Sequence, residues 1–563
     1  MLLDSDHTQS VPRERQPVLS VSDLQIDAFG DDASKTLLKG ISFDVCAGET
    51  VCIVGESGSG KSVTSLAIMG LLPPGALGAT NGSITIDGED ILKAPEARLR
   101  KMRASTMAMV FQEPMTALNP VQKVGRQIDE VLRVHTALSA QDRRAAVMKM
   151  LEAVRLPDIE RIYNSYPHQL SGGQRQRIVI AMALILKPRV LNADEPTTAL
   201  DVTTQKQILV LIRELQQVQK TAVVFITHDF GVVSEIADRI VVMNRGALVE
   251  TGTRDGILAN PREDYTRSLV SSVPSLIPRY NSDPNAEKVL DVVGLGKNYE
   301  ERRFFGSTRA VAAAVGVNLS VARGEITGIV GESGSGKSTV ARCIEMLIEP
   351  SAGSVFLMGE NIANARGREI RKVRQCVQFV FQDPYRSLNP RRTVGDSVIE
   401  GLLNYGTPRA EALAEAAHAL ELVGLDRSAM ERYPHQFSGG QRQRICIARA
   451  LVMKPDLLIA DEAVSALDVT VQAQVLKLLD DIRVRTGIGI LFITHDLRVA
   501  AQICHKIVVM RKGEVVEAGD ATTVLANPQH DYTRTLIDAA PGRDWDFQHF
   551  RPTQPQPPRP LSA

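Results

Sequence analysis

The stretch GESGSGKS occurs twice in the chain, at Gly55–Ser62 and at Gly331–Ser338. Each copy follows a short apolar run, TVCIV or ITGIV, and precedes a helical pattern. Apolar runs of this length are typical of strands that are buried on both faces of a parallel sheet. The repeat therefore predicts two α/β domains in tandem, each with a glycine-rich loop between a strand and a helix.

Three further motifs recur in the same order and support an internal duplication. They are FQEPMTALNP at Phe111 and FQDPYRSLNP at Phe381, YPHQLSGGQRQR at Tyr166 and YPHQFSGGQRQR at Tyr433, and FITHD at Phe225 and at Phe492. A short segment with three prolines separates the copies and is typical of a linker. We expect a flexible tail at 1–17, one domain at 18–272, the linker at 273–288, the second domain at 289–540, and a proline-rich tail at 541–563, whose RPTQPQPPRPLSA ending we expect to be disordered.

The composition is that of an ordinary globular protein and excludes several classes. The 563 residues are 44% hydrophobic and 23% charged, which at roughly 150 residues per domain indicates several packed units. Basic and acidic residues both number 65, so no net charge draws the chain to nucleic acid. The N-terminus lacks the apolar core of a signal peptide, and prolines and glycines break the uncharged run at 62–86, so we expect no membrane span.

The six cysteines show no ligand spacing, which predicts buried thiols in a reducing compartment and a cytosolic location. They are Cys46, Cys52, Cys343, Cys376, Cys446 and Cys504.

The glycine-rich loops have the context of a phosphate-binding loop. Their backbone N–H groups can converge on phosphates at a helix N-terminus, Lys61 and Lys337 can neutralise charge, and Ser62 and Ser338 can offer a hydroxyl to Mg²⁺. The predicted binding residues are Gly55, Glu56, Ser57, Gly58, Ser59, Gly60, Lys61 and Ser62, and Gly331, Glu332, Ser333, Gly334, Ser335, Gly336, Lys337 and Ser338. A plain Gly/Ser turn is the alternative, and the preceding strand and the second copy disfavour it.

Paired carboxylates end two further strand-like runs, RVLNADE and LLIADE. Period-2 alternation predicts that Asp194 and Glu195, and likewise Asp461 and Glu462, point to opposite faces. Each Asp can then face Mg²⁺, while each Glu acts on the attacking water as general base. A lone Asp-Glu pair is usually a solvated turn, and the upstream phosphate loop is what favours the chemical role.

The stretches LSGGQ and FSGGQ each place Ser-Gly-Gly before a helix. The predicted binding residues here are Ser171, Gly172, Gly173 and Gln174, and Ser438, Gly439, Gly440 and Gln441. Their N–H donors and hydroxyl suit a γ-phosphate, and an ordinary helix N-cap explains the same residues equally well.

Taken in order, these motifs resemble the ATP-binding cassette (ABC) family. The resemblance implies an α/β fold of two tandem nucleotide-binding domains, each with a RecA-like core, an antiparallel β subdomain and a helical subdomain. It implies ATP and Mg²⁺ as ligands. Each ATP would be held by the phosphate loop of one copy and by the LSGGQ or FSGGQ stretch of the other copy, which is the signature motif of the family. It also implies that Gln112 and Gln382 sense Mg²⁺ and the attacking water, and that His228 and His495 contact the γ-phosphate.

Other roles are also carried over from the resemblance. Asp201 and Asp468 would lie in the loop that communicates between the sites, and Phe29 and Tyr299 would be aromatic platforms for adenine, although aromatic residues there are more often core.

The FQEPMTALNP-type segments and the NPREDYTRSL and NPQHDYTRTL endings resemble the peptide, glutathione and nickel importer branch. That likeness implies two transmembrane permease subunits and an extracytoplasmic solute-binding protein as partners, at the cytoplasmic face of the inner membrane. The branch's four-cysteine motif is missing, so no iron–sulfur cluster is expected. Asn192 also departs from the branch, which usually has an aliphatic residue there, and we expect it to be hydrogen-bonded within the sheet.

The leading hypothesis is an ATP-hydrolysing, energy-coupling subunit of a dipeptide, oligopeptide or glutathione importer. Four alternatives are a soluble twin-cassette ATPase acting on ribosomes or DNA, an exporter, a chain with one inactive half, and an importer of nickel or an opine. The short linker and the lack of zinc motifs disfavour the first alternative. The complete motifs in both copies disfavour an inactive half. The sequence leaves the solute open.

Overall fold

The computed structural model describes residues 16–29, 35–112, 114–198, 200–302, 308–465 and 467–553. It contains two compact units. Unit 1 comprises 1–198, 207–228 and 235–257, and unit 2 comprises 199–206, 229–234 and 258–563.

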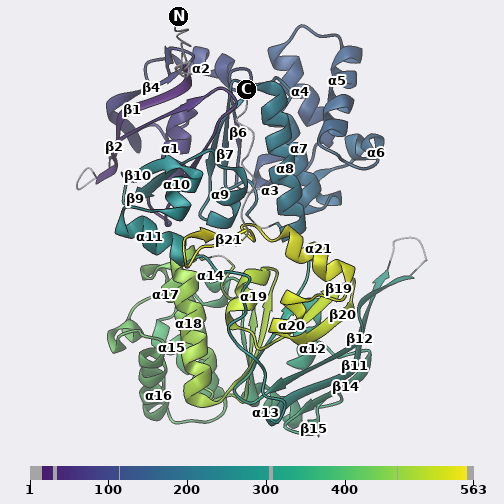
Figure 1. Cartoon of the computed structure of the whole chain (residues 1–563). Helices are drawn as coiled ribbons and strands as arrows, with labels where there is room; N and C mark the ends of the chain where they lie inside the picture. The colour runs from purple at the N-terminus through teal and green to yellow at the C-terminus, as the bar shows by residue number, and fades with distance from the viewer. Residues whose placement is uncertain are drawn as a thin grey trace, which may run out of the picture. The chain divides into compact units, whose positions relative to one another are not determined.

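Each sequence copy carries one antiparallel sheet and one mixed, mainly parallel sheet (Figure 1). In the first copy the antiparallel order is β2-β1-β4-β5, and the second sheet runs β10-β9-β3-β8-β7-β6 with only the β9–β10 pairing antiparallel. The strands are β1 (Pro17–Ala28), β2 (Lys35–Cys46), β3 (Thr50–Val54), β4 (Leu77–Ile86), β5 (Glu89–Asp90), β6 (Met107–Val110), β7 (Val190–Asp194), β8 (Ala222–Ile226), β9 (Arg239–Asn244) and β10 (Ala247–Thr253).

Helices α4 to α7 of this copy lie together beside strands β6 and β7 (Figure 1). The helices are α1 (Lys61–Ile68), α2 (Glu96–Met102), α3 (Pro114–Ala117), α4 (Val124–His135), α5 (Ala140–Ala153), α6 (Ile159–Asn164), α7 (Gly172–Leu184), α8 (Val202–Gln219), α9 (Phe230–Ile236), α10 (Arg254–Ala259) and α11 (Asp264–Ser271), with a 3₁₀ turn at Pro167–Gln169.

The second copy repeats this topology, with sheet orders β12-β11-β14-β15 and β16-β17-β18-β13-β19-β20. Its strands are β11 (Lys288–Arg302), β12 (Thr308–Ala322), β13 (Ile326–Val330), β14 (Ala352–Leu357), β15 (Glu360–Asn361), β16 (Val377–Val380), β17 (Leu457–Asp461), β18 (Gly489–Thr494), β19 (Lys506–Arg511) and β20 (Glu514–Asp520). Its helices are α12 (Lys337–Ile344), α13 (Arg368–Cys376), α14 (Pro384–Ser387), α15 (Val394–Asn404), α16 (Arg409–Leu422), α17 (Gly439–Leu451), α18 (Val469–Thr486), α19 (Leu497–Ile503), α20 (Ala521–Ala526) and α21 (Asp531–Ala539), with 3₁₀ turns at Arg427–Glu431 and Pro434–Gln436.

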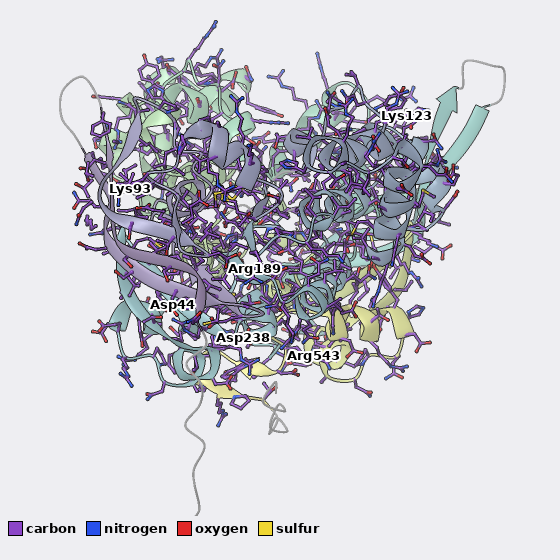
Figure 2. All side chains as sticks on the ribbon, turned by 90° about the horizontal axis from the view of Figure 1, so that it is seen from above. Asp44, Lys93, Lys123, Arg189, Asp238 and Arg543 are labelled. Carbon is purple, nitrogen blue, oxygen red and sulfur yellow. The ribbon has the colours of Figure 1, made fainter. Side chains whose placement is uncertain are left out.

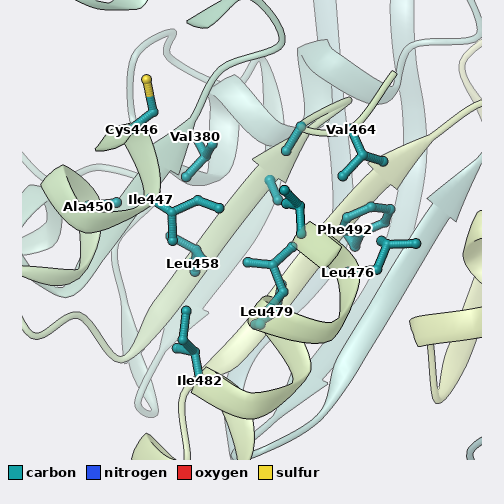
Figure 3. Close-up of a cluster of buried hydrophobic side chains, with 14 of the residues drawn as sticks. Val380, Cys446, Ile447, Ala450, Leu458, Val464, Leu476, Leu479, Ile482 and Phe492 are labelled. Carbon is teal, nitrogen blue, oxygen red and sulfur yellow. The ribbon is translucent and has the colours of Figure 1, made fainter. Parts of the chain in front are cut away.

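The apolar runs beside the phosphate loops are central strands, as their composition predicts. All five residues of β3 and all five of β13 are buried. In the second copy, Ile447 of α17, Leu458 of β17, Leu479 of α18 and Phe492 of β18 belong to one cluster of buried side chains (Figure 3). Burying a side chain as large as Phe492 contributes roughly 1.5–3 kcal/mol, so this cluster holds the strands that carry the site.

The segment at 273–288 belongs to unit 2 and packs against its α18 and α19 regions. The hydroxyl of Tyr280 donates to Asp480 across 2.7 Å, and its ring stacks on His505 with the centroids 4.9 Å apart. The side chain of Gln502 donates to the carbonyl of Ser275 at 3.0 Å. This linker is therefore held in place by specific side-chain contacts.

The C-terminal segment is ordered further than its composition predicts. Residues 541–553 include a small antiparallel pair, β21 (Trp545–Asp546) and β22 (Arg551–Pro552), and the rings of Trp545 and Phe547 are buried and stacked. The expectation of disorder from residue 551 is thus wrong for the first residues of that stretch. Residues 554–563 and most of the expected N-terminal tail lie outside the described residues.

Charged side chains of both signs are spread over the surface, among them Asp44, Lys93 and Lys123 (Figure 2). None of the helices in the described part of the chain has the length and apolar character needed to cross a bilayer. All six cysteines are free thiols, four of them buried, whereas Cys46 and Cys376 are only half-buried.

Candidate functional site

Both phosphate loops have the backbone that their glycines predict. Gly60 and Gly336 lie in the left-handed region, with φ of 104° and 102°, immediately before α1 and α12. A Cβ on Gly336 would lie 2.3 Å from the carbonyl oxygen of Ala313, a distance too short for any side chain. Glycine is therefore required for the loop to turn into the helix at this point.

The two loop lysines are buried and held in the same way. Lys61 donates to the carbonyls of Gly55 and Glu56 at 2.7 and 2.9 Å, and Lys337 donates to those of Gly331 and Glu332 at 2.8 and 2.9 Å. Burial lowers the pKa of Lys337. Each ammonium group thus lies within its own loop, where it can meet a phosphate.

Of the residues expected at each Mg²⁺ site, the serine and the aspartate are hydrogen-bonded to each other, whereas Gln112 and Gln382 contact the neighbouring glutamate. Ser338 Oγ donates to Asp461 at 3.2 Å, and Ser62 hydrogen-bonds Asp194. Burial, with the neighbouring charge of Glu195, raises the pKa of Asp194 to about 6, and burial likewise raises that of Asp461. A hydroxyl and a carboxylate are hard oxygen donors of the kind that Mg²⁺ prefers, so this donor set fits the ion.

The two carboxylates of each pair diverge for a reason other than strand alternation. Strands β7 and β17 end at Asp194 and Asp461, and the following Glu195 and Glu462 have φ of 46° and 49°. Non-glycine residues seldom adopt this left-handed conformation, and such strain concentrates at functional sites. A local backbone turn, present in both copies, therefore aims each glutamate.

Glu195 lies at the centre of a hydrogen-bond network within unit 1. Its carboxylate accepts from Gln112 Nε2 at 2.9 Å and from Thr198 Oγ1 at 3.0 Å, and it lies 2.9 Å from His228 Nδ1. Two predicted site residues, Gln112 and His228, thus lie beside the predicted general base Glu195. Thr198 was not among the predicted site residues, and only its place three residues after the glutamate could have indicated it.

In the second copy, the corresponding glutamine and histidine contact the carboxylate of Glu462, whereas the corresponding serine contacts its backbone. Gln382 Nε2 donates to Glu462 at 2.7 Å, and His495 Nδ1 lies 3.3 Å from the carboxylate. Ser465, which corresponds to Thr198, donates instead to the backbone carbonyl of Glu462 at 3.0 Å.

Both glutamates are held as carboxylates. Burial acts to raise their pKa values. The hydrogen bond and charge of the adjacent histidine, the charge of the loop lysine and, at Glu195, the hydrogen bond from Thr198 together outweigh burial, so the pKa of each glutamate is lowered. For His495, burial acts to lower the pKa and the contact with Glu462 raises it. An ionised carboxylate in this position can accept a proton from water.

The signature serines cap their helices. Ser171 Oγ accepts from the N–H of Gln174 at 3.3 Å, and Gln174 accepts from the N–H of Ser171 at 3.0 Å. Ser438 and Gln441 form the same capping box on α17. Each box belongs to a 13-residue helix whose N-terminus can attract an anion, so the structural and the phosphate-binding roles are compatible.

The two candidate adenine platforms are exposed. Phe29 is 50% exposed, and Tyr299 is 40% exposed with Lys297 Nζ 5.5 Å from its ring centroid. Neither aromatic ring is fully buried in the core.

Asn192 is fully buried and bonded to a helix rather than within the sheet. Its Nδ2 donates to the carbonyl and the hydroxyl of Ser65 on α1, at 2.9 and 2.8 Å. Ile459 and Ala341 occupy these positions in the second copy. The polar pair therefore ties β7 to the helix that begins with Lys61.

A pocket of 390 Å³ lies between α4, α7 and the loop that follows α3. Its lining includes Asn119, Val131, Val134 and Met182. Gln127, which is buried, donates to the carbonyl of Asn119 and accepts from its N–H, so it fixes the Leu-Asn-Pro stretch at the rim.

Comparison with known protein families identifies the same repeated units. A family model described as "ABC transporter" matches residues 38–198 and 315–465. A second model, "Oligopeptide/dipeptide transporter, C-terminal region", matches residues 249–308 and 516–562.

Curated relatives match along almost the whole chain. A protein from Escherichia coli O157:H7 named "Glutathione import ATP-binding protein GsiA" is 45% identical over 557 residues, which cover 93% of this chain and 89% of the relative. The protein of the same name from E. coli strain K12 has the same identity and coverage. The one from Salmonella paratyphi A is 44% identical over 94% of this chain and 90% of its own.

Proposed function

The chain belongs to the ABC transporter family and is an ABC-type ATPase with two cassettes, and on this premise we propose that it powers the import of glutathione or a small peptide. The observation that carries the proposal is the similarity over 93% of the chain to proteins named for glutathione import. The two oligopeptide/dipeptide C-terminal regions support the same class of solute. We propose residues 18–272 and 289–540 as the two cassettes.

The proposed ATP sites use the same groups in both copies. Backbone N–H groups of the phosphate loop and Lys61 or Lys337 bind the phosphates, and Ser62 with Asp194, or Ser338 with Asp461, hold Mg²⁺. When bound, Mg²⁺ neutralises charge on the phosphate oxygens. We also propose that the signature residues from Ser171 to Gln174 and from Ser438 to Gln441 bind the γ-phosphate at the opposite cassette, and that Phe29 and Tyr299 stack on adenine.

Hydrolysis then depends on the glutamate network. Glu195 and Glu462 orient the attacking water and accept its proton at a carboxylate oxygen. Gln112 and Gln382 hold that carboxylate from one side, and His228 and His495 hold it from the other and contact the γ-phosphate. The contacts of each glutamate support this division of roles.

Permease subunits are the proposed partners, and the pocket beside α4 is the proposed docking surface in the first cassette. Val131 and Val134 give it apolar lining, and the neighbouring Val121 is 79% exposed. Apolar side chains that gather on a surface in this way mark interaction sites. We propose that a short cytoplasmic helix of a permease subunit binds there and holds the chain at the inner face of the membrane, with a solute-binding protein on the other side.

The solute can be tested on the solute-binding protein that we propose as a partner of this chain. Its thermal unfolding should be measured with glutathione, dialanine, a tripeptide, an opine and NiCl₂. We expect glutathione or one of the peptides to raise the melting temperature, because a ligand that binds only the folded state stabilises it. A shift with the opine or NiCl₂ alone would replace the proposed solute with that one.

A further inference from the structure

A tyrosine of the C-terminal region contacts the second phosphate loop. The hydroxyl of Tyr532 accepts a hydrogen bond from the backbone N–H of Glu332, the second residue of the loop, across 3.2 Å. The side chain of Glu332 is also hydrogen-bonded to that hydroxyl. Tyr532 therefore holds both the backbone and the side chain of one loop residue.

The tyrosine itself is fixed in place. It is 5% exposed, and the guanidinium of Arg511 lies 4.7 Å from its ring centroid. At the start of α21, its N–H donates to His530 Nδ1 at 3.0 Å. The N–H of His530 in turn donates to Glu517 of β20 at 3.1 Å. Contacts that run from Glu517 of β20 through His530 to Tyr532 thus fix the position of the tyrosine beside the phosphate loop.

The same loop is held from a second direction by the β19–β20 turn. The N–H of Gly513 in that turn donates to the carbonyl of Ser335 at 2.9 Å. Arg511, which lies against Tyr532, is the last residue of β19. The turn and α21 therefore support the loop at two residues, Ser335 and Glu332.

We propose that Tyr532 is a positioning residue for the second ATP site, through which the C-terminal region of the chain sets the conformation of the loop Gly331–Ser338. The inference rests on the proposed role of that loop in binding phosphates. Because the N–H of Glu332 is occupied by the tyrosine, the loop is ordered before nucleotide arrives, and ordering before binding strengthens binding. Without the hydroxyl, a partly buried N–H loses its partner and the loop is free to move.

The test is Tyr532→Phe in the full chain, because phenylalanine keeps the ring and removes only the hydroxyl. Affinity for the fluorescent nucleotide TNP-ATP should be measured in two backgrounds. In Lys61→Ala the second site dominates binding, and in Lys337→Ala the first site does. Tyr405→Phe is the matched control, since its hydroxyl donates to the carbonyl of Arg371 on α13 at 2.6 Å and does not contact the loop.

We expect Y532F to weaken TNP-ATP binding by about 2- to 10-fold in the K61A background, the loss typical of one hydrogen bond, and to leave the K337A background unchanged. Amide exchange in the peptide that contains 331–338 should also become faster, while the peptide that contains 55–62 stays as in wild type. Y405F should change neither.

Equal affinity for Y532F and its parent in the K61A background overturns the inference. An equal loss in both backgrounds also overturns it, because a general loss of stability would act on both sites. Failure of the phosphate-loop assignment would be seen separately, as binding that neither lysine variant weakens.

Discussion

The side-chain amide of Gln112 donates a hydrogen bond to the carboxylate of Glu195 across 2.9 Å, although 83 residues separate the two in the sequence. Gln382 and Glu462 form the same contact at 2.7 Å in the second copy. The loop that leaves β6 and the turn that follows β7 thus meet at the ends of neighbouring parallel strands. This is the place where parallel sheets carry their functional side chains.

The hydrogen bond from Thr198 to Glu195 predicts that two matched variants differ in the pH dependence of ATP hydrolysis. Thr198→Ala removes a donor to the Glu195 carboxylate, whereas Ser465→Ala removes a donor to a backbone carbonyl. A carboxylate that loses a hydrogen bond has a higher pKa. Because the base must be ionised, the acid limb of the ATPase pH–rate profile should move to higher pH in T198A and stay in place in S465A. Identical profiles for the two variants would show that Thr198 does not act on the carboxylate.

The buried pair Asn192 and Ser65 predicts non-additive effects on stability. Asn192→Ala should lower the free energy of unfolding by about 1–3 kcal/mol, because it removes a buried side chain and its hydrogen bonds. The double variant N192I/S65A introduces the residues of the second copy and should be close to wild type, since replacing both polar partners by apolar groups is often nearly neutral. Thermal unfolding of the single and double variants tests this. Additive losses would mean that the two side chains do not interact.

Because His505 is buried with a lowered pKa, we expect the folded chain to lose stability in mild acid. Burial and the nearby charge of Arg483 lower its pKa to about 4, below the value of about 6.5 expected in the unfolded chain. The unfolded state therefore binds a proton first as the pH falls, so stability is complete above about pH 6.5 and declines towards pH 4. His505→Asn keeps an acceptor for the N–H of Ile326 and removes the titration. We expect melting temperatures measured at pH 7.5 and 5.0 to differ less in H505N than in wild type, and an equal difference would count against this role.

Removal of the metal should abolish hydrolysis. Chelation of Mg²⁺ by EDTA should stop ATP turnover, and restored Mg²⁺ should recover it. Ser62→Ala and Ser338→Ala should each raise the Mg²⁺ concentration that gives half-maximal activity, because each removes one proposed ligand. Ser105→Ala, at an exposed serine bonded to the carbonyl of Lys101, is the control. Unchanged Mg²⁺ dependence in the double variant S62A/S338A would refute the assignment.

Much of the fold follows from the sequence because the deciding residues act locally. TVCIV and ITGIV form central strands, and the glycine before each loop lysine adopts the left-handed conformation that only glycine takes readily. The linker and the C-terminal segment were harder to predict. Composition describes how a segment behaves alone, whereas the stacking of Tyr280 on His505 and the hydrogen bond from Gln548 to Gln502 join these segments to distant parts of the chain.

The site was predictable to the extent that its residues occur in repeated motifs. Thr198 and Tyr532 were missed as site residues because threonine and tyrosine are common in turns and cores, and only their distances to Glu195 and Glu332 distinguish them. The divergence of each Asp-Glu pair was predicted for the wrong reason. It comes from a positive φ at the glutamate and not from strand alternation.

The central claim is that both ATP sites are chemically complete and that both are needed. Glu195→Gln and Glu462→Gln test it through steady-state ATPase activity of the chain in complex with its permeases, with the exposed Glu152→Gln as control. Losing a general base typically costs on the order of 10²- to 10⁴-fold in the affected step. We expect each variant to lose nearly all coupled hydrolysis and uptake and to trap the ATP-bound state, and E152Q to match wild type. If one variant loses nearly all turnover while the other keeps uptake close to wild type, the two sites are not equivalent and the claim is contradicted.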